Sequence, residues 1–150
     1  MGLELVNTKP GRIIIAAGGT GLFPFCDLID LLFKDMLVKK NHEKKAELIN
    51  ADPILQQSPF DNFSFVFLAA FNEPEDIPPI IYSQLVRLSE AKDRIKIVLR
   101  FSRNADQLRS RGKIEFTKEY FNNRTVTEAA VEGLSRVWVC GPPKMNHDIS

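Results

Sequence analysis

Four residues that could bind an anion follow the first apolar run of the chain. The apolar, largely β-branched segment Ile13–Ala17 leads directly into Gly18-Gly19-Thr20-Gly21. Glycines allow left-handed backbone angles and let a ligand approach the main chain closely. Free N–H groups at the start of a following helix, together with the Thr20 hydroxyl, favour a phosphate. The spacing fits neither G-x-G-x-x-G nor a Walker loop, so a purely structural strand-to-helix turn stays open as the alternative.

A second candidate is a thiol at the end of the last apolar run. The segment Ser135–Cys140 reads SRVWVC, and Gly141, Pro142 and Pro143 follow it. Gly141 allows a turn without a Cβ, and the prolines stiffen the exit. A cysteine at a strand end is more often a small buried packing residue than a functional thiol. The functional interpretation becomes the stronger one if this strand lies beside the first, because the thiol and the Gly-rich turn would then face one crevice.

Short apolar runs bounded by turn residues predict the strands that position both motifs. These runs are Arg12–Ala17, Phe63–Phe71, Arg94–Phe101 and Ser135–Cys140. Helical patterns separate them, so strand and helix alternate along the chain. This alternation predicts right-handed βαβ crossovers and an open parallel sheet in a three-layer α/β/α sandwich. Ligands of such sheets bind beyond the carboxyl ends of the strands.

Three helices are expected between these strands. The first runs from Leu22 to about Lys39. The second begins near Asp76 and buries Ile81, Leu85 and Leu88. The third is short and follows the capping-box spacing of Thr125 and Glu128, which makes Thr125 its N-cap. Residues 41–62 are expected to form a partly helical insertion.

The composition limits the classes of partner. The chain has 150 residues, enough for one domain, and its 20 basic and 19 acidic side chains give a net charge of +1. That balance provides no concentrated basic field for nucleic acid or an anionic membrane. Two cysteines are too few for a disulfide scaffold or a metal site on their own, so we expect no metal. A reducing, cytoplasmic location is expected. If the parent protein is membrane-bound, this domain is expected on the cytosolic face of the membrane.

The two glycine-containing motifs together resemble a known family. GGTGLFPF, followed about 120 residues later by CGPPKM, resembles the pyridine-nucleotide-binding domain of the ferredoxin–NADP reductase superfamily. That superfamily includes ferric reductases, NADPH oxidases and other electron-transfer flavoproteins. The resemblance implies one NAD(P)H-binding domain over residues 1–150, as a fragment of a longer flavoprotein. It also implies the strand order 3-2-1-4 with the fifth strand missing, which leaves Ser135–Cys140 at an edge open to self-association.

The resemblance assigns a role to each matched residue. Gly18, Gly19, Thr20 and Gly21 would hold the pyrophosphate and the nicotinamide-side ribose, with Pro24 in the same loop. Cys140, Gly141 and Pro142 would line the nicotinamide pocket. Cys140 is the candidate catalytic residue, since it would hold the nicotinamide at transfer distance. The hydride would pass to a flavin, FAD, carried by a separate domain that this chain does not contain.

The loop after the third strand bears on the choice of dinucleotide. Ser102 and Arg103 resemble the Ser-Arg pair that binds the 2′-phosphate in NADPH-using members, and Arg111 lies close by in sequence. A dianionic phosphate favours guanidinium donors and a hydroxyl. An NADH site would favour a carboxylate for the ribose diol, and the only one nearby before Glu115 is Asp106. We therefore expect NADPH rather than NADH, with a basic solvated loop as the alternative.

These observations predict an NAD(P)H-binding domain of a flavin-dependent oxidoreductase. The expected partners are a pyridine dinucleotide and the flavin domain of the parent protein, and not nucleic acid. The alternative is a non-catalytic nucleotide-sensing or interaction module with the same fold. A small hydrolase or kinase is disfavoured, because the chain has neither a P-loop lysine nor a G-x-S-x-G elbow.

Overall fold

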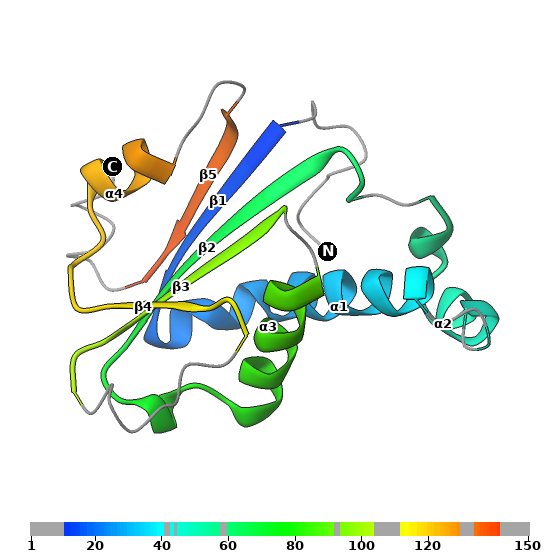
Figure 1. Cartoon of the computed structure of the whole chain (residues 1–150), viewed down its shortest axis with the longest axis horizontal. Helices are drawn as coiled ribbons and strands as arrows, with labels where there is room; N and C mark the ends of the chain where they lie inside the picture. The colour runs from blue at the N-terminus through cyan, green and yellow to red at the C-terminus, as the bar shows by residue number, and fades with distance from the viewer. Residues whose placement is uncertain are drawn as a thin grey trace.

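A parallel sheet forms the centre of the fold (Figure 1). The computed structural model of the chain describes residues 11–40, 43, 45–57, 60–91, 94–103, 112–129 and 134–141. The strands are β1 (Gly11–Gly18), β2 (Phe63–Phe71), β3 (Ile95–Phe101), β4 (Glu115–Thr117) and β5 (Leu134–Cys140). Their order is β4-β3-β2-β1-β5, and each neighbouring pair is parallel.

The predicted order of the four longer strands is confirmed. The expected strands one to four are β1, β2, β3 and β5, and they lie in the order β3-β2-β1-β5. The prediction missed β4, which spans only three residues, Glu115–Thr117, because so short a segment gives no recognisable alternation. β5 lies at an edge, as expected, and pairs with β1 alone among the described strands. Self-association through that edge stays a prediction.

Helices cover both faces of this sheet, as a three-layer sandwich requires. The helices are α1 (Cys26–Lys40), α2 (Lys45–Ala51), α3 (Pro79–Ala91) and α4 (Asn123–Ala129), with 3-10 segments η2 (Gly19–Phe25), η3 (Pro53–Gln57) and η4 (Pro74–Asp76). Of these, α1 and α3 pack on one face of the sheet, and α4 packs on the other. The segments α2 and η3 confirm that residues 41–62 are partly helical. None of the helices in the described part of the chain is long and apolar enough to cross a membrane.

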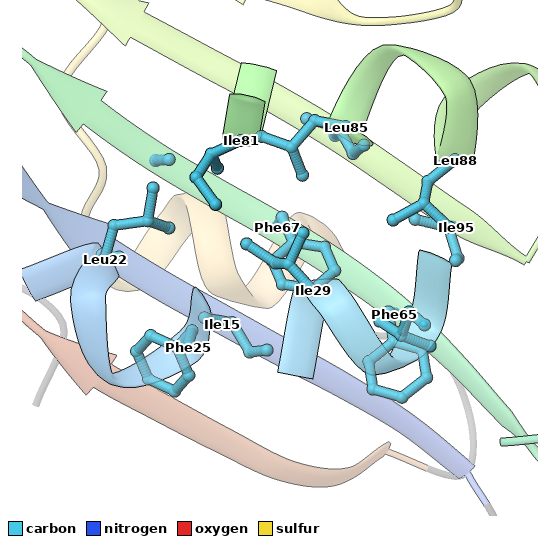
Figure 2. Packing of buried hydrophobic residues seen from close by; sticks show 14 of the residues in the cluster. Ile15, Leu22, Phe25, Ile29, Phe65, Phe67, Ile81, Leu85, Leu88 and Ile95 are labelled. Atoms are coloured by element: carbon cyan, nitrogen blue, oxygen red, sulfur yellow. The ribbon is translucent and has the colours of Figure 1, made fainter. Parts of the chain in front are cut away.

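The alternation of side chains along β1 divides the core in two. Ile13 and Ile15 are buried in the cluster that includes α1 and α3. Ile14 and Ala16 are buried in a second cluster, against which Val126 of α4 packs. Figure 2 shows the first cluster, in which helix side chains meet the aromatic side chains of β2. The predicted buried face of α3 is confirmed by the exposed fractions of Ile81 (8%), Leu85 (1%) and Leu88 (0%).

Two helices begin later than predicted, for local reasons. The first was expected at Leu22, but η2 precedes it, contains Pro24, and delays α1 to Cys26. The second was expected near Asp76 but begins at Pro79. The carboxylate of Asp76 is already engaged, because its Oδ2 accepts a hydrogen bond from the Glu73 N–H at 3.1 Å in the capping box of η4.

The N-cap of α4 also differs from the prediction. Asn122 Oδ1 accepts a hydrogen bond from the Thr125 N–H at 3.1 Å, and Thr125 Oγ1 accepts one from the Asn122 N–H at 3.1 Å. Asn122 is therefore the N-cap, and Thr125 is the third helical residue that bonds back to it. The helix begins before Thr125 because asparagine is at least as good an N-cap as threonine.

Candidate functional site

A pocket of about 470 Å³ opens where β1, β2 and β3 end. Its wall is formed by the Gly18–Thr20 turn, the end of β2 at Ala70–Asn72, Arg100 of β3 and the residues Tyr120 and Phe121 before α4. This is the carboxyl end of a parallel sheet, where ligands of open α/β folds bind. The volume is typical of a small-molecule or cofactor site.

The glycines of the first motif have different structural roles. Gly19 has a φ of +56°, in the left-handed region, and a Cβ built there would meet no atom within 4 Å. Gly18, Gly19 and Thr20 all line the pocket, so the two glycines offer backbone without a side chain and Thr20 offers a hydroxyl group. Gly21 instead packs against β5, since a Cβ there would lie 2.1 Å from the Cys140 carbonyl oxygen. Its missing side chain is required by the fold rather than by the pocket wall.

The same contact brings the two sequence motifs together. The register of β1 and β5 places Cys140 beside Ala17, one residue before the Gly-rich turn. Thr20 and Cys140 therefore lie on the same rim of the sheet, as expected. Cys140 is a half-buried free thiol that packs against the α1–α3 side of the core. The pocket wall contains neither Cys140 nor Gly141, so their assignment to the nicotinamide stays a prediction.

Several other predicted site residues lie away from the described pocket wall. Pro24 is exposed within η2 and does not line the pocket. Arg111 and Pro142 lie outside the described residues. The assignment of these three residues to the cofactor is therefore left as a prediction.

The Ser102–Arg103 pair follows β3 at the same edge of the sheet. Their backbone N–H groups donate to the carbonyls of Phe71 (3.1 Å) and Asn72 (2.8 Å), which fixes the loop beside the end of β2. Ser102 Oγ accepts a hydrogen bond from Arg100 Nη1 at 3.1 Å. The Arg103 side chain is 68% exposed, and its Nη2 lies 3.6 Å from Glu73 Oε1. Neither residue is part of the pocket wall.

Two charged residues that line the pocket, Asp76 and Arg100, were not predicted from the sequence as site residues. Asp76 lines the pocket from η4, which follows β2 and is distant in sequence from the loop after β3. Arg100 of β3 is only 8% exposed. Its guanidinium carbon lies 3.8 Å from the centre of the Tyr120 ring. The only signal in the sequence was the position of Arg100 near the carboxyl end of the predicted strand Arg94–Phe101.

Three acidic residues lie next to one another beside the pocket, and their proximity changes the pKa of one of them. Glu73, Glu75 and Asp76 lie together at η4. The hydrogen bond and charge of Glu73 raise the pKa of Glu75. No group of three or more His, Cys, Asp or Glu side chains in the described part of the chain is placed to hold a metal ion.

Comparison with known proteins shows the fold. No family model matches the chain, and no curated protein sequence matches it significantly. The solved cytochrome b5 reductase domain of Ulva prolifera nitrate reductase is similar to it, with a TM-score of 0.59 and 20% sequence identity. The similarity covers 95% of this chain but only 43% of that one, so the chain spans less than half of its length. The chain therefore has the fold of part of a cytochrome b5 reductase domain, which confirms the open parallel α/β fold expected from the sequence.

Proposed function

We propose that this chain is the NAD(P)H-binding domain of a flavin-dependent oxidoreductase. The observation that carries the proposal is the pocket at the ends of β1–β3, whose wall includes the bare backbone of Gly18 and Gly19. A fold shared with part of a reductase domain supports it. The flavin would be carried by another domain of the parent protein.

The strand order supports one direction for a dinucleotide across the sheet. Gly18, Gly19 and Thr20 would bind the pyrophosphate through N–H groups and a hydroxyl. Cys140 and Gly141, at the end of the neighbouring strand β5, would hold the nicotinamide. Bound NAD(P)H would supply the hydride, which a flavin accepts. The contribution of these residues is placement, since they fix the distance and orientation of the reacting ring.

Calorimetric titration of the chain with NADPH, NADH and nicotinamide mononucleotide tests this proposal. We expect saturable binding of at least one dinucleotide and much weaker binding of the mononucleotide, which lacks the adenosine half. Absence of binding for both dinucleotides would contradict the proposal.

We propose NADPH as the preferred dinucleotide, on the basis of Ser102 and Arg103. Arg103→Ala is expected to weaken NADPH binding by about tenfold, because a charge-assisted hydrogen bond contributes roughly 1.5–3 kcal/mol and this side chain is exposed. NADH binding should change far less. Competition titrations measure both, with Arg124→Ala, an exposed arginine of α4, as the control. Equal losses for the two dinucleotides would overturn the assignment.

A further inference from the structure

Arg100 is a buried charge without a carboxylate partner among the described residues. It is 8% exposed, and a guanidinium so deeply buried is ordinarily paired, because removal of its charge from water is costly. Its Nε donates to the Lys118 carbonyl oxygen at 3.3 Å, and its Nη1 donates to Ser102 Oγ at 3.1 Å. Its third contact is the face of the Tyr120 ring at 3.8 Å. All three partners are neutral.

The sheet register places Arg100 beside two small residues at the pocket. Gly18 pairs with Ala70, and Ala70 pairs with Arg100, so the three residues form one row and share one face of the sheet. Gly18 has no side chain and Ala70 has a single methyl group, which leaves the space beside Arg100 open. All three residues line the pocket. The Cα atoms of Gly18 and Arg100 are two strand spacings apart, roughly 10 Å.

The guanidinium has donors left for a ligand. Arginine carries about five N–H donors in a fixed planar arrangement. Two of the nitrogens of Arg100, Nε and Nη1, donate to the protein. A phosphate accepts two parallel hydrogen bonds from such a group, and these bonds are stronger in a partly desolvated site. The centre of the Tyr120 ring lies 3.8 Å from the guanidinium carbon, and this contact restricts the group before binding and so lowers the entropy cost of binding.

We propose that Arg100 binds a phosphate group on the adenosine half of the dinucleotide; this inference rests on the proposed function. The strand order supplies the direction. The Gly-rich turn at the end of β1 lies between β5, which ends at Cys140, and β3, which carries Arg100. A dinucleotide with its nicotinamide at Cys140 and its pyrophosphate at the turn extends its adenosine toward β3. Arg100, and not only the exposed Arg103, is then the guanidinium that faces the ligand.

Substitution of Arg100 tests the assignment in the full 150-residue chain. Arg100→Met keeps the length of the side chain and removes its charge, and Arg100→Lys keeps the charge and removes the planar donors. Calorimetry should show that Arg100→Met lowers the affinity for NADPH by about tenfold or more and that Arg100→Lys lowers it less. The control is Arg124→Met, at an exposed arginine outside the pocket, which should bind as the wild type does.

The same titration with NADH identifies the phosphate. If Arg100→Met loses affinity for NADH and NADPH equally, Arg100 contacts the phosphate of the pyrophosphate that is attached to adenosine. A loss confined to NADPH supports contact with the 2′-phosphate. Wild-type affinity of Arg100→Met for both dinucleotides would overturn the inference and leave Arg100 a structural residue that holds the segment at Lys118 and Tyr120.

A measurement on the wild-type chain keeps the inference testable if Arg100→Met does not fold. The Nε–Hε resonance of Arg100 is followed by ¹⁵N NMR during titration with adenosine 2′,5′-bisphosphate, with adenosine as the control. We expect a saturable shift with the bisphosphate and none with adenosine. An unmoved resonance in a chain that binds NADPH overturns this inference alone, whereas a chain that binds neither dinucleotide overturns the proposed function.

Discussion

Gly21→Ala is expected to lower the free energy of unfolding by about 3 kcal/mol, near the upper end of typical overpacking costs. A Cβ at this position would lie 2.1 Å from the carbonyl oxygen and 2.6 Å from the carbonyl carbon of Cys140. Both atoms belong to the backbone of β5, so the clash is relieved only if the turn and the strand separate. Urea denaturation measures the loss. NADPH binding should fall as well, because the displaced turn carries the proposed phosphate contacts.

Gly19→Ala is the matched control for this substitution. Its Cβ would meet nothing within 4 Å, and its strain comes only from the φ of +56°. That strain costs roughly 1–2 kcal/mol. If Gly21→Ala proves as stable as Gly19→Ala, the close packing of the Gly-rich turn on β5 is wrong.

Ala70→Leu is expected to reduce NADPH affinity by about 100-fold while the fold persists. Ala70 lies between Gly18 and Arg100 in one register row and lines the pocket. A leucine there fills space that the ligand needs, and even one methylene in a tight pocket changes discrimination by about 10–200-fold. Ala70 is only partly buried against the second core cluster and also lines the pocket, so the added group has the pocket to enter and the unfolding midpoint should change little.

Calorimetry and thermal unfolding of the variant check both expectations. Ala51→Leu makes the same substitution at an exposed position of α2, and it should leave NADPH affinity unchanged. Wild-type affinity in Ala70→Leu would show that the dinucleotide does not occupy this pocket.

The longer strands were predictable because the apolar pattern that marks each of them is local. Ile13–Ala17 is apolar without alternation, as a strand covered on both faces should be, and it is indeed buried on both. The order followed from the resemblance carried by the glycine and cysteine motifs. β4 was not predictable, since three residues with intermediate or exposed side chains carry no periodic pattern.

The helix starts were less predictable, because caps compete locally. Asp76 is a good N-cap by type, yet its carboxylate bonds to the Glu73 N–H within η4. The sequence predicts a capping box of Thr125 and Glu128, but the structure has one formed by Asn122 and Thr125. Both motifs satisfy the same rule, and the earlier one prevails because asparagine is at least as good an N-cap as threonine.

Only the part of the candidate site that is continuous in sequence was predictable. The Gly18–Thr20 turn is a continuous motif, and its place at the end of β1 follows from the strand before it. Arg100 became a site residue only through its register with Ala70 and its contact with Tyr120. Asp76 joined the pocket through the connection after β2. Such contacts between distant segments leave no mark in the local sequence.

The most direct test of the central claim is an ¹⁵N NMR titration of the wild-type chain with NADPH. We expect saturable shifts of the backbone amides of Gly18, Gly19, Ala70 and Tyr120, which line the pocket. We also expect a shift of the Cys140 amide with NADPH that is absent with ADP-ribose 2′-phosphate, which lacks the nicotinamide. Shifts confined to another face of the molecule, or no saturable shift at all, would contradict a dinucleotide site at the ends of β1–β3.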